Sequence, residues 1–547
     1  MKNLLAGIFV SIVFFGVSGT LVAQETIQIN GVQATRVIIG PATTPIARTI
    51  KAGLSTSYYS ARPGTREHAK AQKLYYFYGA RHFEPLWLTE DAQGKVAFSP
   101  SALKIISVFK DAHLVGLTSN DYLTDDINLD LIGTGSDAMA LLETAFSAAT
   151  MRYAQDTHGG RIKPRAVSSS FSLKPNRIDE AATLLKLASA SDPAQILYEL
   201  EPMHREFVAL KSALAGFYDG TTEEPIVVPE GKTLRLGMSD PRVPLMRERL
   251  GIDTPETTGN DYDDVVLAAI EKFQQELGLT VDGIVGPATI AALNGGSAVS
   301  KDDIVANMER WRWMPRSLGD FNVFVNIPEF RLAVMNGEEI AHSTRVVVGK
   351  PKHKTPIFSD EIEHIVVNPY WNVPASIANN EIAPKLLQNP GYISRNNMEL
   401  LAGGRVIDAA AVDWSSTSVN KFRIRQRPGS GNALGSVKFL FPNKHAVYLH
   451  DTPSKSLFSR SYRAFSHGCV RVHNPWEFTK ALLQIEPQIT LAGLEAQRGR
   501  SERWNNLATH IPVHIAYFTL RVSEDGTIRS YGDVYGHNKK LKGLLSE

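Results

Sequence analysis

One cysteine stands in the chain of 547 residues, and two histidines lie near it in the sequence. Cys469 follows His467 by two positions and His450 by nineteen. A thiol attacks a carbonyl as its thiolate, and an imidazole within hydrogen-bond reach can take the proton. The arrangement therefore predicts a cysteine nucleophile with a histidine base. On spacing alone, a buried and unreactive cysteine is the alternative.

A metal site is a second use for the same residues. Cys469 together with His450, His467 and His473 offers the sulfur and nitrogen ligands that zinc prefers. Their spacings do not follow the patterns of structural zinc sites. We therefore expect no metal and no other cofactor here.

The residues around the cysteine suit attack on a carbonyl. Gly468 lets backbone amides approach a substrate oxygen closely, as an oxyanion hole requires. Arg471 can hold a carboxylate through its planar fork of donors. His450 ends the run AVYLH, which reads as a strand, and a loop of fifteen residues then leads to Ser466. The strand end and the returning loop can bring His450 and Cys469 together.

The pattern of His450, fifteen residues and SHGCVR at 466–471 resembles the signature of the L,D-transpeptidase (YkuD-like) catalytic domain. The last signature position is often asparagine or an arginine-containing variant, and Arg471 fits a large branch of the family. Members of that branch carry a signal peptide, a helical scaffold, a peptidoglycan-binding domain and a catalytic domain with an inserted lid. Three further stretches agree with the family: VNPYWNVP at 367–374, RQRPGSGNALGSVKFLFPN at 425–443 and YLHDTP at 448–453.

The resemblance implies a role for each candidate residue. Cys469 matches the nucleophile and His450 the general base. His467 and Gly468 match residues that shape the site and its oxyanion hole, and Arg471 matches a position near the substrate carboxylates. The remaining candidate substrate contacts are Tyr448, Trp371, Asn368 and Ser466. Packing alone is the alternative for the two aromatic residues in that set.

The resemblance also implies a reaction. The thiolate attacks the carbonyl between the third and fourth residues of a tetrapeptide stem, D-alanine leaves, and a thioester remains. The side-chain amine of diaminopimelate in a second stem then takes the acyl group and forms a 3→3 cross-link. Two other acceptors fit the same chemistry: an amine of an outer-membrane protein or lipoprotein, or water in an L,D-carboxypeptidase. The alternative that is not an enzyme is a protein that only binds the cell wall.

The N-terminus predicts export. Lys2 precedes an apolar run from Leu4 to Val17, and small residues lead to Ala23. This is the pattern of a signal peptide over 1–23. We therefore expect a periplasmic protein with no stable transmembrane segment after cleavage.

Composition narrows the class of partner. The net charge of +2 is too balanced to favour nucleic acid. In an oxidising compartment cysteines usually come in pairs, so a single thiol in an exported chain points to a use of its own. The expected partners are peptidoglycan stems and, beyond them, other wall-synthesis enzymes or outer-membrane proteins.

The elements that must position these residues suggest a multidomain α+β fold. Residues 24–60, rich in Thr, Ser, Pro and Gly, read as a flexible tether. Residues 61–222 carry apolar side chains at helical spacing and predict an α-helical scaffold domain. Residues 234–297 resemble the three-helix peptidoglycan-binding domain through the run FQQELGLTVDGIVGPATIAAL.

From about residue 320 the apolar period changes to two, which predicts strands. We expect a mainly β catalytic domain over 320–500, with the β-sandwich that the resemblance implies. The irregular helical stretch 376–420 reads as an inserted lid that can shield a thioester from water. Residues 505–547, with a turn at Asp525-Gly526, are expected to add C-terminal strands that close this domain.

Overall fold

The computed structural model describes most of the chain: residues 39–90, 96–127, 136–229, 231–256, 259–276, 279–294, 299–499 and 501–546. It also assigns three earlier strands, β1 (Val10–Val13), β2 (Gln24–Ile29) and β3 (Val32–Val37). Apart from β1, the predicted signal peptide at 1–23 lies outside the described residues. The chain divides into two units, residues 1–161 with 176–222, and residues 162–175 with 223–547.

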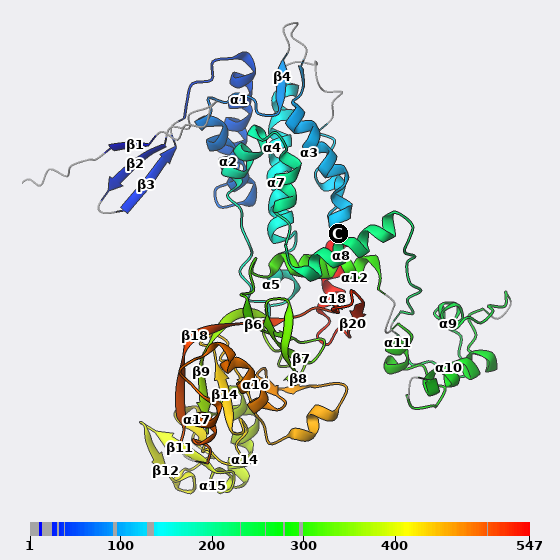
Figure 1. Cartoon of the computed structure of the whole chain (residues 1–547), viewed down its shortest axis with the longest axis vertical. Helices are drawn as coiled ribbons and strands as arrows, with labels where there is room; N and C mark the ends of the chain where they lie inside the picture. The colour runs from blue at the N-terminus through cyan, green and yellow to red at the C-terminus, as the bar shows by residue number, and fades with distance from the viewer. Residues whose placement is uncertain are drawn as a thin grey trace, which may run out of the picture. The chain divides into compact units, whose positions relative to one another are not determined.

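The first unit is built mainly of helices, as the apolar spacing predicted (Figure 1). Its core is rich in aromatic side chains, among them Trp87, Phe109 and Phe146. Thr65 and Ser99 cap helix starts by accepting a backbone N–H. The elements are α1 (Pro45–Ser60), α2 (Arg66–Ala80), α3 (Pro100–Lys110), α4 (Ser136–Gly159), α6 (Glu180–Ser189), α7 (Pro193–Glu199), α8 (Arg205–Tyr218) and the hairpin β4 (Leu88–Glu90) with β5 (Val96–Phe98).

The prediction of a tether over 24–60 is wrong for its second half. Helix α1 begins at Pro45, which suits the first helical position, and Thr44 caps it. Its apolar residues recur at helical spacing and are buried in the core of the unit: Ala47, Ile50 and Leu54. The polar residues that suggested a tether include Thr56 and Ser57, which are exposed on this helix.

A second correction concerns residues 162–175, which we expected inside the scaffold domain at 61–222. They belong to the second unit. After helix α5 (Pro164–Val167), Phe171 is buried in the core of that unit, with its ring 5.4 Å from the ring of Trp313. The N–H of Ile357 donates to the carbonyl of Ser170 at 2.8 Å, which ties this segment to the β domain.

Three helices follow in the segment that resembles a peptidoglycan-binding domain: α9 (Val243–Leu250), α10 (Asp264–Glu276) and α11 (Pro287–Leu293). The Tyr262 hydroxyl donates to the carbonyl of Gly283 at 2.6 Å. Gly283 has φ +62°, and a Cβ there would meet the Leu267 side chain at 2.2 Å. The turn before α11 therefore requires this glycine.

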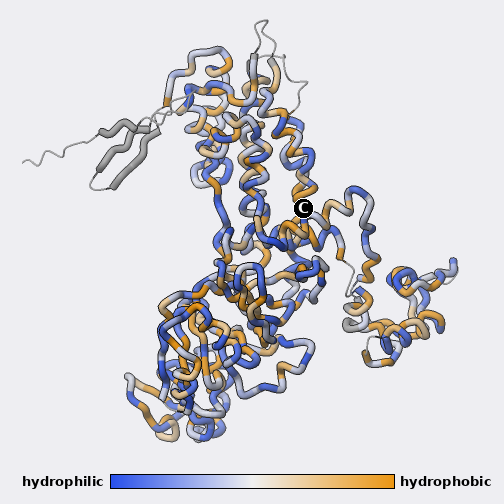
Figure 2. Tube along the Cα trace, in the orientation of Figure 1, coloured by the Kyte–Doolittle hydropathy of each residue, from blue (hydrophilic) through white to orange (hydrophobic). Residues whose placement is uncertain are grey.

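The rest of the second unit is dominated by one nine-stranded sheet, in the order β16-β8-β17-β15-β14-β9-β18-β6-β7. An additional pairing of β7 with β8 closes the sheet on itself. The two layers of the expected sandwich therefore belong to one continuous sheet. Figure 2 shows hydrophobic residues along these strands. The strands are β6 (Phe321–Asn326), β7 (Arg331–Asn336), β8 (Glu339–Gly349), β9 (Phe358–Val367), β14 (Val437–Leu440), β15 (Leu449–His450), β16 (Ala464–Ser466), β17 (Val470–Val472) and β18 (Arg503–Ala516).

The insertion between β9 and β14 combines helices with a sheet of its own. Four strands pair in the order β10-β13-β11-β12, and a separate apolar core that includes Trp414 supports them. The elements are β10 (Trp371–Asn372), α13 (Ala375–Ile377), the π-helical turn η4 (Ala378–Ile382), α14 (Ala383–Gln388), α15 (Tyr392–Arg395), β11 (Met398–Ala402), β12 (Arg405–Ile407) and β13 (Arg423–Gln426).

The C-terminal end differs from the predicted strands of 505–547. After β18 and the hairpin β19 (Leu520–Val522) with β20 (Ile528–Ser530), the chain forms helix α18 (His537–Ser546). Asp303 of helix α12 (Lys301–Trp313) accepts from Asn538 and Lys542, both at 2.8 Å. The remaining helices of this unit are α16 (Pro475–Leu482) and α17 (Leu491–Glu495).

Candidate active site

Two neighbouring parallel strands carry the candidate residues. In β15 and β17, Leu449 lies opposite Val470, and His450 lies opposite Arg471. Successive side chains of a strand point to opposite faces, and Leu449 and Val470 are in the buried core. The other face therefore carries four of the predicted site residues: Tyr448, His450, Cys469 and Arg471.

The thiol of Cys469 is in contact with Tyr448. Burial raises the pKa of the thiol, while a hydrogen bond from the Tyr448 side chain and the charge of Arg471 oppose that rise. The carbonyl oxygen of Ala446 lies 3.9 Å from Sγ. Because the pKa of the thiol is raised, it is protonated at neutral pH and requires a base to react.

The imidazole of His450 is in the neutral state that a general base requires. Its side chain is buried, and Nδ1–H donates to the carbonyl of Asp451 at 2.5 Å, which leaves the lone pair on Nε2. Burial, with the charge of Arg471 as the second cause, lowers the pKa of His450 to about 3. The imidazole is therefore neutral near pH 7. It lies diagonally from Cys469 across the strand pair, whereas Tyr448 lies opposite Cys469.

The lowered pKa of His450 makes the free energy of unfolding depend on pH. Its pKa is lowered from 6.5 to about 3, so the unfolded chain binds a proton in this window that the folded chain does not. Stability is thus lost as the pH falls from 6.5 towards 3, by roughly 1.4 kcal/mol per pH unit. We expect His450→Gln to remove this slope when unfolding by urea is compared from pH 4 to 7. Parallel pH profiles of parent and variant would contradict the assignment.

Tyr448 lies between two of the other predicted residues. Burial raises the pKa of Tyr448 well above its usual value, so its hydroxyl remains a donor. Cys469 adds to that rise of the pKa, and Trp371, the first residue of β10, opposes it. The side chains of Cys469 and Trp371 thus both influence the Tyr448 hydroxyl.

Ser466 and Gly468 shape the turn before the cysteine. Ser466 is buried; its hydroxyl donates to the carbonyl of Cys469 at 2.5 Å and accepts the N–H of Gly468 at 3.1 Å. Gly468 has φ +122°, a conformation that side chains with Cβ rarely adopt. The hydroxyl that we expected to contact substrate is therefore bound inside the turn, and so is the Gly468 amide.

His467 points to the insertion instead of the thiol. Its Nε2 lies 2.7 Å from Oε1 of Glu381, a residue of the π-helical turn η4. Lys350 Nζ is 3.3 Å from the same nitrogen, and the ring of His353 is 5.0 Å away. Burial lowers the pKa of His467, and Glu381 opposes that effect. This contact links the inserted segment to the turn that carries Cys469.

Two cations lie on either side of His450. Arg471 is its neighbour on β17, and among the described residues its buried Nε finds no hydrogen-bond acceptor. A substrate carboxylate or carbonyl can satisfy that donor. On the other side, Lys438 of β14 is opposite His450, buried, 3.7 Å from Glu502. Sequence reasoning missed Lys438, whose only signal was a lysine inside the apolar run VKFLF.

Asn368 holds a loop in place. Its Nδ2 donates to the carbonyl of Gln497 at 2.7 Å, and its Oδ1 accepts the N–H of Gly499 at 3.1 Å. It also lines a cavity of about 370 Å³ next to Asp451. Because its polar side-chain atoms are hydrogen-bonded to backbone groups, Asn368 holds the wall of this cavity in place and does not offer them to a substrate.

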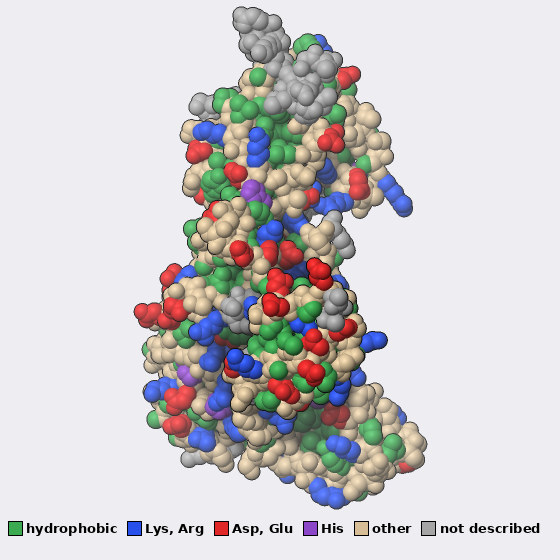
Figure 3. Space-filling model, turned by 90° about the vertical axis from the view of Figure 1, so that its right-hand side faces the viewer, with side chains coloured by type: hydrophobic (Ala, Val, Ile, Leu, Met, Phe, Trp, Pro, Cys, Tyr) green, Lys and Arg blue, Asp and Glu red, His purple; other side chains and the backbone are tan. Residues whose placement is uncertain are grey.

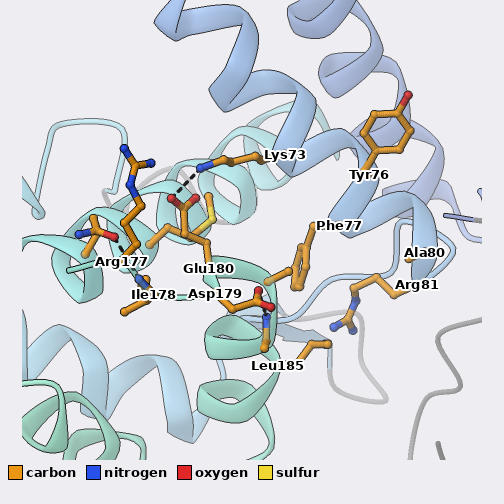
Figure 4. A pocket seen from close by; sticks show the side chains of 14 residues that line it. Lys73, Tyr76, Phe77, Ala80, Arg81, Arg177, Ile178, Asp179, Glu180 and Leu185 are labelled. Atoms are coloured by element: carbon orange, nitrogen blue, oxygen red, sulfur yellow. Dashed lines mark hydrogen bonds and ion pairs between the residues drawn. The ribbon is translucent and has the colours of Figure 1, made fainter. Parts of the chain in front are cut away.

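A cavity of about 510 Å³ lies in the first unit, between α2 and α6 (Figure 4). Lys73 crosses it and pairs with Glu180 at 2.7 Å. Arg81 donates to the carbonyls of Glu84 and Pro85. The larger volume of this cavity does not make it the better candidate, because the residues that line it include no cysteine, serine or histidine nucleophile or base.

The described residues also bear on partners. On the face shown in Figure 3, acidic and basic side chains are both spread over the surface. Within the described ranges, no group of three His, Cys, Asp or Glu is placed to bind a metal ion. None of the helices in those ranges has both the length and the apolar character needed to span a bilayer.

Comparisons with known families match three parts of the chain. Residues 320–484 match the model of the YkuD family, described as "L,D-transpeptidase catalytic domain". Residues 72–214 match a "Scaffold domain", and residues 248–293 match a "Putative peptidoglycan binding domain".

One curated relative and two solved structures are similar to this chain. A Haemophilus influenzae protein named "Putative L,D-transpeptidase" is 34% identical over 247 residues, which are 44% of this chain and 48% of that protein. The chain thus spans about half the length of the curated relative that it matches. An L,D-transpeptidase structure from Xylanimonas cellulosilytica is 16% identical, with coverage of 53% and 99% and a TM-score of 0.16. L,D-transpeptidase 1 of Mycobacterium tuberculosis is 11% identical, with coverage of 36% and 61% and a TM-score of 0.17. TM-scores this low do not establish a shared fold.

Proposed function

We propose that this chain, whose residues 320–484 match the L,D-transpeptidase catalytic domain of the YkuD family, forms 3→3 cross-links between peptide stems of peptidoglycan. The observation that carries the proposal is the register of β15 and β17, which puts Cys469 and His450 on one face of the sheet. The match of residues 248–293 to a peptidoglycan-binding domain supports the choice of polymer.

In the first half-reaction, Nε2 of His450 takes the proton of the Cys469 thiol. The sulfur attacks the carbonyl carbon between the third and fourth residues of a tetrapeptide stem. The C–N bond breaks, His450 returns the proton to the leaving D-alanine, and a thioester remains. Because burial lowers its pKa, the imidazole of His450 is neutral at neutral pH, and its Nε2 carries the lone pair that accepts this proton.

In the second half-reaction, the diaminopimelate side-chain amine of another stem attacks the thioester. His450 takes a proton from this amine, an amide bond forms, and the sulfur leaves as the thiol. The Tyr448 hydroxyl, whose pKa is raised by burial, is a donor for the negative oxygen that develops in each step. Arg471 holds a carboxylate or carbonyl of a stem through its Nε. His467 and Gly468 hold the turn and the insertion in place.

The products of the purified protein test this function. Incubation with disaccharide-tetrapeptide should give dimers joined between two third-position residues, together with free D-alanine. Tripeptide without dimers would instead identify an L,D-carboxypeptidase. Muropeptides linked to an outer-membrane protein or lipoprotein, in wall isolated from cells with this gene and absent without it, would identify a protein acceptor.

The insertion at 376–420 is proposed as a lid that keeps water from the thioester. The Glu381 contact to His467 holds it against the nucleophile turn. We expect Glu381→Gln to increase the ratio of hydrolysed to cross-linked product several-fold, because a charged hydrogen bond is weakened. Glu361→Gln is the matched control, since Glu361 pairs with His510 away from the turn. An unchanged ratio in both Glu381→Gln and a deletion of 376–420 would contradict the lid.

The substrate also sets the compartment. Peptidoglycan lies outside the cytoplasm, so we propose a periplasmic protein that is exported by residues 1–23 and cleaved near Ala23. N-terminal sequencing of the protein purified from the periplasm tests this proposal. An N-terminus at Met1 would contradict it.

A further inference from the structure

The segment 162–175 forms one side of a pocket next to the nucleophile turn. It is tied to the rest of the second unit through Ser170 and Ser172. The N–H of Ser172 donates to the carbonyl of Ile357 at 2.8 Å, Ser170 Oγ is 3.2 Å from His537 Nε2, and Ser172 Oγ is 2.9 Å from His445 Nε2. With Phe171 buried in the core, this segment has a defined place in the catalytic unit.

The pocket has a volume of about 480 Å³, and we call it the basic pocket. It is lined by Ser168, Ser169 and Ser170 on one side and by Lys352, Lys354 and His445 on the other. It also includes His467 and Gly468 of the nucleophile turn, so it adjoins the reacting centre. Its lining, all within the described residues, holds two lysines and no carboxylate.

The two lysines differ in their surroundings. Lys354 is half-buried, and its Nζ donates to the carbonyl of Tyr535 at 3.3 Å and lies 5.7 Å from the centre of that ring. Lys352 is exposed at the pocket. Burial lowers the pKa of His445, and its Nε2 is engaged by Ser172. At neutral pH the positive charge of the lining therefore comes mainly from the lysines.

We propose that the basic pocket is a subsite for a carboxylate of the peptide stem, with Lys352 as its main determinant and Ser168–Ser170 as its outer side. This inference rests on the proposed function for the identity of the substrate. A tetrapeptide stem carries a C-terminal carboxylate and the carboxylates of its acidic residues. An ammonium group and neighbouring hydroxyls are donors that a carboxylate accepts.

The test measures binding without reaction. In the Cys469→Ala protein, calorimetry compares a tetrapeptide stem that has free carboxylates with one whose carboxylates are amidated. We expect Lys352→Gln to reduce the preference for the free stem by about two- to fivefold, the range of an exposed ion pair. Ser169→Glu, which adds a negative charge at the pocket, should weaken the free stem more than the amidated one.

Lys480→Gln is the matched control, since Lys480 is an exposed lysine of helix α16 and does not line the pocket. It should leave the preference unchanged. If Lys352→Gln and Ser169→Glu both keep the parental preference, the subsite is wrong, even where the parent makes 3→3 dimers. If the parent makes no dimers, the proposed reaction fails, while the binding comparison still decides whether the pocket selects a carboxylate.

Discussion

Replacing Cys469 by alanine is expected to reduce kcat/KM for stem transfer by at least about 10⁴-fold, because no other group in the site can form the acyl-enzyme. Both half-reactions pass through the sulfur, so dimers and hydrolysed tripeptide should disappear together. The measurement is chromatography of the muropeptides after incubation of equal amounts of parent and variant.

The thiol is only half-buried, and alanine removes a single heavy atom, so the fold of the variant should be retained. Thermal unfolding of parent and variant serves as the control. Dimer formation by a folded Cys469→Ala protein at more than a few per cent of the parental rate would exclude the cysteine mechanism.

The second large effect is expected for His450→Gln, a loss of about 10²- to 10⁴-fold at neutral pH. Without the base, only the ionised fraction of Cys469 reacts, and burial raises the pKa of that thiol. The rate of the variant should therefore rise about tenfold per pH unit above neutrality. The parental rate should be nearly flat down to acidic pH, because the pKa of His450 is about 3.

The His467→Gln variant distinguishes the role of His467 from that of His450. The imidazole of His467 contacts Glu381 and not the thiol, so it should affect product partition more than the rate of acylation. A steep pH dependence in His467→Gln together with a flat profile in His450→Gln would reverse the assignment of the base.

The proximity of Cys469 and His450 could be predicted from sequence because they lie in one short stretch. A strand that ends in His450 and a loop that returns to Cys469 leave few ways to separate them. Tyr448 was harder to place, since periodicity gives its face but not its partner. Only the register of β15 with β17 puts it next to the thiol and distinguishes a site residue from a core tyrosine.

Other features depend on contacts between residues far apart in the chain. Glu381 reaches His467 from the insertion, and Lys438 reaches His450 across a strand pair. Neither pairing leaves a local pattern. The segment 162–175 looked like part of a helical region, yet Phe171 finds its place in the core of the β domain.

The local composition of two helices does not indicate their structure. Helix α1 has many Thr and Ser residues, which are typical of a tether, beside its three buried apolar positions. Helix α18 follows a hairpin and is rich in lysine, although Leu541 and Leu544 give it apolar side chains at helical spacing. In both cases tertiary packing decides the structure of a segment whose composition is ambiguous.

Mass spectrometry of the protein after incubation with a carbapenem tests the central claim most directly. The thiolate of Cys469 should open the β-lactam ring, and the ring carbonyl then becomes a thioester to the enzyme. We expect the parent to gain the mass of one carbapenem on the peptide that contains Cys469, and the Cys469→Ala protein to gain none. A parent protein that stays unmodified, or carries the adduct on another residue, would contradict the cysteine acyl-enzyme.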